Sequence, residues 1–498
     1  MPKNTPKDYF NTDHLKADLK QRSVRGGAVT IFAQSSKFGL KFGSTIVLAR
    51  MLVPEDYGLI GMATVVTGFV EYFKDLGLST ATIQRREINH QQISTLFWIN
   101  IAVACIVALV VALLAPVVAS FYNEPRLEGI TQALAINFIF GGLTVQHQAL
   151  LKRQMQFTSL AKIEIASMFV GVATAVIAAY YGLNYWALVL MFLATTATNA
   201  VGVWLACSWR PGLPRRNCGV GSMLAYGSNL TGFNLLYYFS SNLDNLSIGK
   251  IWGSGQLGLY AQAYRLLLLP ISQINNPISK VALPALCSLQ GEPEKYCRYY
   301  YKAILIITTL GMPVVWFMFA CTEPLVLTLL GEQWSGTILI FRCLAPAAAI
   351  NTFNMAEGWV YQSLASTDRM FRWGVIFTIG NVLVILLSVR GGIVRVAIAY
   401  SLYLVLSKIP SLAYCYHQTP LKVIDLLRTI YRPTVAAMGA GTIVFGMEYF
   451  SLVRVRALLD LGIYAILYGV AYISLWLCLP NGRSTLLNML AIKQMLLK

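Results

Sequence analysis

The sequence predicts an all-α, polytopic membrane protein with about fourteen transmembrane helices, and three observations support that prediction. Only 12% of the 498 residues are charged and 56% are hydrophobic, whereas a soluble domain has roughly 25% charged residues. Apolar runs of about 20 residues, the length that crosses a bilayer core, recur along the whole chain. One stretch of the sequence also occurs twice, which predicts two similar halves.

The duplicated stretch comprises residues 46–63 (IVLARMLVPEDYGLIGMA) and residues 246–263 (LSIGKIWGSGQLGLYAQA). Each copy holds an apolar helix end, a cation, a short polar turn and a glycine that opens the next apolar helix. An alignment without gaps places Gly58 on Gly258. Because six predicted spans separate the copies, they share one orientation, which is typical of two lobes related by an axis along the membrane normal.

Fourteen apolar segments define the predicted spans. Residues 321–336 lie between the ninth and tenth of them, and their sequence predicts either an extension of a neighbouring helix or a segment that dips into the membrane. The spans are residues 24–48, 58–83, 93–120, 129–148, 159–180, 184–207, 222–248, 256–283, 303–321, 337–361, 371–389, 393–415, 432–449 and 459–479.

The distribution of basic residues predicts the orientation. We count the Lys and Arg residues of the loops and tails together with those at the adjacent span ends. By this count, 24 lie on the side of the N-terminus and 7 on the other side. The positive-inside rule therefore places both termini in the cytoplasm. This topology accounts for the net charge of +18 without a nucleic-acid partner. Residues 1–23 lack the apolar segment of a cleaved signal peptide, so the first span is expected to be an uncleaved anchor.

The predicted domains follow from the duplication and from a basic, proline-containing linker. Two six-helix lobes surround a central cleft, and two extra helices follow the second lobe. The domains are a cytoplasmic tail (1–23), the N-terminal lobe with spans one to six (24–208), a cytoplasmic linker (209–221), the C-terminal lobe with spans seven to twelve (222–416), the extra spans thirteen and fourteen (417–479) and a cytoplasmic tail (480–498).

Several classes of site find no support in the sequence. The nine cysteines form no CxxC motif or Cys/His cluster, so neither a metal site nor a disulfide framework is predicted. Residues 253–258 (GSGQLG) match a dinucleotide-binding motif but lie between two spans rather than after a strand, so no cofactor is predicted. The outer loops are short and the four histidines belong to no acid–base set, so we expect no enzyme.

Polar residues on the first span form one part of a candidate substrate site. A lysine at mid-span costs about 2.5–3.5 kcal/mol, so two lysines on one face are not expected to contact lipid. They either line a wet cavity or pair with carboxylates elsewhere. The stripe consists of Thr30, Gln34, Lys37, Lys41 and Ser44, whose steps of 4, 3, 4 and 3 place them on one helical face.

The eighth span repeats this polar pattern around Arg265 and Lys280. Eight cations and five acids lie within the spans, and this excess favours an anionic substrate. The acids Glu71, Asp244 and Glu357 are either H⁺ or Na⁺ sites or partners of nearby lysines. The predicted cationic cleft comprises Lys37, Lys41, Arg265 and Lys280, with Gln34, Asp244, Arg342, Asn351, Asn354 and Glu357 as further candidates.

Several motifs resemble one transporter family. The first half contains LARMLVPEDYGLIGMA and FKDLGLSTATIQ, and the second contains LGLYAQAYRLLLLPISQINNPISKVALPAL. Together they resemble the polysaccharide flippases of the multidrug/oligosaccharidyl-lipid/polysaccharide exporter superfamily, in particular the colanic-acid and lipopolysaccharide exporters, over the whole chain. The segment YAQAYRLLLLP is also similar to lipid II flippases, whose pattern has a substrate-contacting arginine five residues before a proline, and Arg265 and Pro270 match it. In the first span, Lys37 and Lys41 match the expected charge.

The resemblance implies a flippase in a bacterial inner membrane. Its substrate would be an undecaprenyl-diphosphate-linked oligosaccharide, moved from the cytoplasmic to the periplasmic leaflet for exopolysaccharide, colanic-acid-like or lipopolysaccharide synthesis by alternating access of the two lobes. Membrane lipid, other polysaccharide-assembly proteins and a coupling H⁺ or Na⁺ would be its other partners. The alternative is a small-molecule or drug antiporter of the same superfamily.

Overall fold

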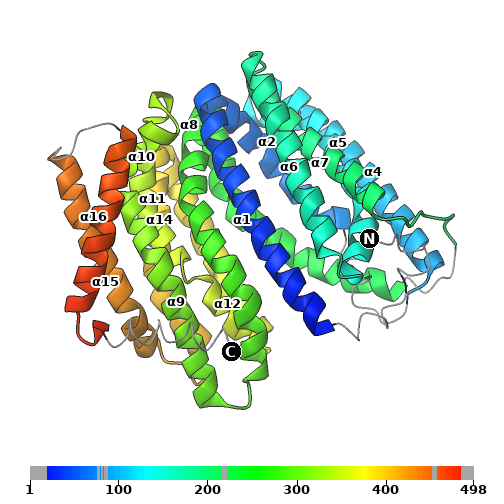
Figure 1. Ribbon diagram of the computed structural model, residues 1–498. Coiled ribbons are helices and arrows are strands. Elements are labelled where there is room, and N and C mark those ends of the chain that lie inside the picture. Colours follow the sequence, from blue (N-terminus) through cyan, green and yellow to red (C-terminus); the bar gives the residue numbers. More distant parts are fainter. Residues whose placement is uncertain are drawn as a thin grey trace. The chain divides into compact units, whose positions relative to one another are not determined.

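The computed structural model describes residues 10, 19–75, 79, 82, 88–215, 221–450 and 457–483. Within these ranges the chain is helical apart from short connections, and no described residue is in a strand (Figure 1). The all-α, polytopic fold class is therefore confirmed. The chain divides into two compact units, Met1–Gly258 and Leu259–Lys498. The lobe and linker boundaries given above concern the duplication and stay a prediction.

Long helices make up the first unit. They include α8, the green helix of Figure 1, which continues into the second unit. The helices are α1 (Leu19–Met51), α2 (Pro54–Asp75), α4 (His90–Tyr122), α5 (Arg126–Arg153), α6 (Phe157–Tyr180), α7 (Tyr185–Ala206) and α8 (Gly221–Ser288).

The second unit combines long helices with several short ones. The two last helices, orange and red in Figure 1, pack against each other. The elements are α9 (Pro293–Ala320), α10 (Thr322–Leu329), the 3-10 turn η2 (Glu332–Trp334), α11 (Thr337–Asn351), α12 (Met355–Ser363), α13 (Thr367–Ser388), the 3-10 turn η3 (Val389–Gly391), α14 (Ile393–Tyr416), α15 (Val423–Tyr449) and α16 (Ala457–Cys478).

Within the described ranges, nine helical segments are long and apolar enough to cross a membrane. They coincide with nine of the fourteen predicted spans, and the other five predicted spans fall on α1, α2, α8 and α15. The helices α9 and α15 begin about ten residues earlier than predicted, at Pro293 and Val423, because polar residues extend each helix beyond its apolar part. The ambiguous region 321–336 forms the short helix α10 and the turn η2.

The helix α4 shows how the sequence forms a span. Asn89 and Gln92 form a capping box at its start, with the Gln92 amide 2.8 Å from Asn89 Oδ1, and Asn123 ends it in the left-handed conformation. One face is buried, whereas Leu109 and Leu113 are apolar and exposed on the other. An exposed apolar face along a 33-residue helix is what contact with lipid requires.

Two glycines bring the duplicated stretches into backbone contact within the first unit. A Cβ on Gly58 would lie 1.7 Å from the carbonyl oxygen of Ser254, and a Cβ on Gly258 would lie 1.8 Å from that of Pro54. Only glycine permits such an approach. The predicted turn between the seventh and eighth spans is reduced to one non-helical residue of α8, Gly253, whose φ is 78°.

Residues at the turn between α4 and α5 contact both copies of the duplicated stretch. Arg126 Nη2 lies 2.5 Å from Glu55 Oε1, and Arg126 Nε lies 2.7 Å from Glu124 Oε1. The Lys250 ammonium donates a hydrogen bond to the Phe121 carbonyl. The hydrogen bond from Arg126 holds the pKa of the Glu124 carboxyl below its usual range. Charged side chains therefore tie the first turn of α2 and the middle of α8 to one rigid turn.

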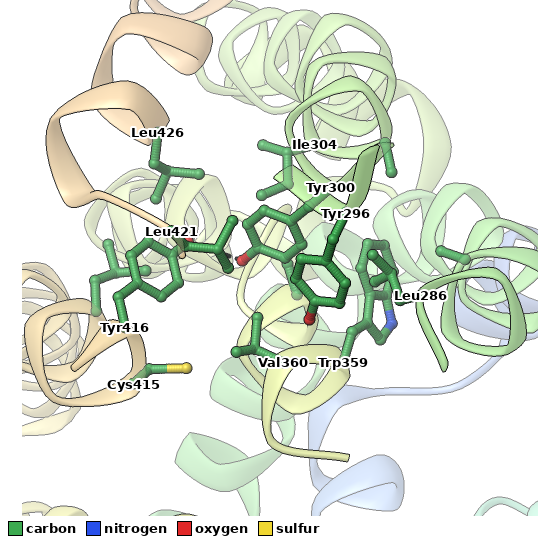
Figure 2. Packing of buried hydrophobic residues seen from close by; sticks show 14 of the residues in the cluster. Leu286, Tyr296, Tyr300, Ile304, Trp359, Val360, Cys415, Tyr416, Leu421 and Leu426 are labelled. Atoms are coloured by element: carbon green, nitrogen blue, oxygen red, sulfur yellow. Dashed lines mark hydrogen bonds between the residues drawn. The ribbon is translucent and has the colours of Figure 1, made fainter. Parts of the chain in front are cut away.

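In the second unit, tyrosines from α9 pack against α12 and α14 (Figure 2). The hydroxyls of Tyr300 and Tyr416 are 2.8 Å apart, and that of Tyr296 is 2.7 Å from Ser363 Oγ. Trp359 of α12 lies in the same buried cluster. Because the hydroxyls of Tyr296, Tyr300 and Tyr416 each have a hydrogen-bond partner, these three groups are buried at little desolvation cost.

A break divides the tenth predicted span. The helix α11 ends at Asn351, residues 352–354 form a turn, and α12 follows. The side chain of Asn275 in α8 donates to the Asn351 carbonyl over 3.3 Å. Non-helical backbone at membrane depth is tolerated where protein surrounds it or where it borders a polar cavity. The break therefore marks a polar position in the second unit.

Candidate functional site

The predicted site residues are divided between the two units. Thr30, on the predicted stripe, and Glu71 have side chains outside the described residues. Gln34, Lys37, Lys41 and Asp244 belong to the first unit, and Arg265, Lys280, Arg342, Asn351, Asn354 and Glu357 belong to the second.

Lys37 forms an ion pair between α1 and α6. Its Nζ lies 2.6 Å from Glu164 Oε2, and the two side chains are 27% and 45% exposed. The sequence left open whether the stripe lysines pair with carboxylates or line a wet cavity. The structure shows the pairing for Lys37, and the wet cavity stays a prediction.

The rest of the stripe follows one side of α1. Lys41 is exposed and Gln34 is partly buried. Ser44 is buried and donates over 2.9 Å to the carbonyl of Lys41 within the same helix. Lys41 lies one helical turn, about 6 Å, beyond Lys37, so the two cations reach adjacent positions.

Asp244 of α8 is 7% exposed. One carboxylate oxygen accepts a hydrogen bond from the amide of Asn245 over 2.7 Å.

Arg265 and Lys280 lie on the same helix but are not brought together. Arg265 is partly buried and Lys280 is exposed. Fifteen residues of helix separate them, which corresponds to about 22 Å, more than the spacing of two phosphates in one diphosphate. Lys280 has no carboxylate within ion-pair distance among the described residues. The structure therefore does not bring these two predicted site residues to one position.

Two further candidates, Asn354 and Glu357, meet at a buried lysine of α14. Lys408 Nζ lies 2.6 Å from Glu357 Oε1 and 2.8 Å from Asn354 Oδ1. Ser411 Oγ donates to Glu357 Oε2 over 2.6 Å, and the ammonium lies 5.1 Å from the Phe353 ring centroid. The Lys408 and Glu357 side chains are only 6% and 11% exposed. This sealed network ties the helix break to α14.

Arg342 of α11 occupies a separate position. It lies 3.8 Å from Glu448 of α15 and 5.2 Å from the Phe445 ring centroid. At the break, the backbone carbonyl of Asn351 accepts the hydrogen bond from the Asn275 side chain. Both contacts join helices of the second unit to one another.

The pairing residues Glu164, Ser411 and Glu448 were not among the candidates, and Lys408 was counted only as a span cation. Glu164 lies five residues after the start of its predicted span, 159–180. The excess of cations gave no indication of which carboxylate meets which lysine. A spacing of three residues places Lys408 and Ser411 on one face of α14, which is the one local signal that links them.

Solved transporters share this fold. The structure is similar to a lipid II flippase, MurJ, in an inward closed conformation, with a TM-score of 0.71 and 11% identity over 91% of this chain and 98% of that one. It is also similar to an inward-facing multidrug transporter of the MATE family and the MOP superfamily, with a TM-score of 0.58 and 15% identity over 78% and 95%. Together with the nine apolar helical segments of the described ranges, this likeness defines the fold of a multi-pass membrane protein.

The sequence comparisons give the family. A family model described as "Polysaccharide biosynthesis protein" matches residues 47–339, more than half of the chain, and the chain belongs to this family. The lipopolysaccharide biosynthesis protein WzxC of Escherichia coli K12 is 25% identical over 72% of this chain and 74% of its own length. The teichuronic acid biosynthesis protein TuaB of Bacillus subtilis 168 is 24% identical over 89% and 91%. The resemblance found in the sequence is thus confirmed.

Proposed function

We propose that the protein is a flippase that transfers an undecaprenyl-diphosphate-linked oligosaccharide from the cytoplasmic to the periplasmic leaflet of a bacterial inner membrane. Membership of the polysaccharide biosynthesis family carries this proposal. The fold shared with a lipid II flippase supports it, as do relatives named for lipopolysaccharide and teichuronic acid synthesis. The chain acts by transport rather than by catalysis.

The chemistry of the substrate agrees with the charges in the spans. Sugars and a diphosphate cannot enter hydrocarbon, because each polar group left unsatisfied there costs several kcal/mol. The prenyl tail is apolar and remains in the lipid throughout. We expect the headgroup to contact the cations Lys37, Lys41, Arg265 and Lys280, whose positive charge complements a diphosphate.

The proposal also includes direction and energy. Both termini face the cytoplasm, as the 24-to-7 distribution of basic residues indicates. A coupling H⁺ or Na⁺ and other polysaccharide-assembly proteins complete the set of partners. Glu71, Asp244 and Glu357 are the acids proposed for an ion site, and Glu357 has Lys408 as a buried counter-ion.

Deletion of the gene tests the function. We expect a cell-surface polysaccharide to be lost and its lipid-linked precursor to accumulate in the cytoplasmic leaflet. Surface glycan and extracted prenyl-diphosphate glycan are measured in the same cells. A deletion that changes drug tolerance and leaves both quantities unaltered would support the antiporter alternative and refute the flippase.

Substitutions of Arg265 test whether this residue binds the anionic headgroup. A guanidinium makes two parallel hydrogen bonds to a phosphate that an ammonium does not reproduce. Arg265→Ala is therefore expected to abolish export at normal membrane abundance, and Arg265→Lys to restore it only in part. Full export by Arg265→Ala at normal abundance would remove this residue from the site, and loss of folded protein alone would show a structural role.

A further inference from the structure

The ion pair of Lys37 and Glu164 differs in kind from the sealed pair of the second unit. Lys408 and Glu357 are 6% and 11% exposed and have additional hydrogen-bond partners. Lys37 and Glu164 are 27% and 45% exposed, and one short contact of 2.6 Å joins them. This pair is therefore less enclosed by protein than the sealed pair and is held by fewer described contacts, so its partners exchange more readily.

The position of the pair suits the start of transport. Lys37 lies fourteen residues before the end of α1, which is about 21 Å along the helix. Glu164 lies seven residues after the start of α6, which is about 10 Å. With the proposed orientation, Lys37 lies near the middle of its predicted span and Glu164 lies near the cytoplasmic start of its own. A substrate from the cytoplasmic leaflet therefore reaches the Glu164 end of the pair first.

Glu164 and a diphosphate offer the same chemistry to Lys37. Both present anionic oxygens to an ammonium, and a diphosphate has more charge and more acceptor oxygens than a carboxylate. Lys41, one turn further along α1, adds a second cation for the diphosphate. A substrate headgroup is therefore equipped to replace the carboxylate at Lys37.

We propose that Glu164 is a built-in anion that occupies Lys37 when the substrate is absent and that the diphosphate headgroup displaces it. This inference rests on the proposed flippase function and adds a residue that sets the affinity of its site. Neutralising Glu164 removes a competitor for Lys37, so the affinity for a prenyl diphosphate rises while the fold is retained.

The experiment measures binding of farnesyl diphosphate to the full-length protein in lipid nanodiscs. We expect Glu164→Gln to lower the Kd about two- to five-fold, the size of effect that an exposed ion pair supports. Lys37→Gln should raise the Kd, and the double variant Lys37→Gln/Glu164→Gln should match Lys37→Gln. Glu128, an exposed carboxylate of the first unit, provides the control: Glu128→Gln removes the same charge and should leave the Kd unchanged.

The possible outcomes distinguish the role of Glu164 from the proposed flippase function. An unchanged or higher Kd for Glu164→Gln, with weakened binding by Lys37→Gln, would leave the flippase function intact and overturn the role of Glu164. Equal tightening by Glu164→Gln with and without Lys37, or by Glu128→Gln, would show a general charge effect and overturn it as well. Failure of the wild-type protein to bind farnesyl diphosphate would refute the anionic site and this inference together.

Discussion

Replacement of Lys408 by methionine is expected to destabilise the second unit strongly. Lys408→Met keeps most of the side-chain volume but removes the ammonium that lies 2.6 Å from Glu357. The Glu357 carboxylate then keeps the hydrogen bond from Ser411 but no counter-ion among the contacts described, at a site 8% exposed. Breaking a buried ion pair on one side costs about 3–5 kcal/mol.

This cost converts into a shift of the unfolding temperature. Unfolding entropy is about 2.1 cal/mol/K per residue, so a second unit of about 240 residues has an unfolding entropy of about 0.5 kcal/mol/K. If this unit unfolds by itself, Lys408→Met lowers the Tm by about 6–10 °C. If the whole chain of 498 residues unfolds cooperatively, the decrease is about 3–5 °C.

A double variant separates the ion pair from general damage to packing. Lys408→Met/Glu357→Gln removes both charges, and replacement of a complete buried pair is often close to neutral. We therefore expect most of the lost Tm to return. Lys422, an exposed lysine of the same unit, is the control, and Lys422→Met should change the Tm by less than about 1 °C.

The assay heats a fluorescently tagged protein in detergent and measures the fraction that remains monodisperse by size-exclusion chromatography. Samples of each variant are taken from membranes with equal protein abundance. A Tm of Lys408→Met within about 1 °C of the wild type, or a double variant as unstable as the single one, would refute the reasoning that Glu357 depends on Lys408.

Two further predictions follow from the fold and the sequence. Gly258→Ala places a Cβ 1.8 Å from a carbonyl oxygen of α2 and should destabilise the protein by about 1–3 kcal/mol, whereas Gly255→Ala, whose Cβ meets open space, should not. Equal Tm values for the two variants would contradict the close helix contact. Single cysteines within residues 210–215 and in the C-terminal tail should both be protected from an impermeant thiol reagent in intact cells, and labelling of either from outside would overturn the proposed orientation.

The sequence by itself determined the class of the protein and the course of its chain. Lipid selects for long apolar segments, because the backbone must satisfy its own hydrogen bonds in hydrocarbon, so composition and segment length predicted the helices. The duplication also predicted that Gly58 and Gly258 are equivalent. Gly58 lies four residues after the start of α2, and Gly258 lies five residues after the non-helical Gly253 of α8.

The tertiary structure decided which charges meet. Glu164 lies 127 residues from Lys37, and Glu357 lies 51 from Lys408, and helical periodicity places a residue on a face without naming the helix opposite. The same limit applies to Gly258. A side chain is excluded at this position because the Pro54 carbonyl of α2 lies too close to it. Pairing across helices depends on how the helices pack, because an ion pair forms only where two faces approach within a few ångströms.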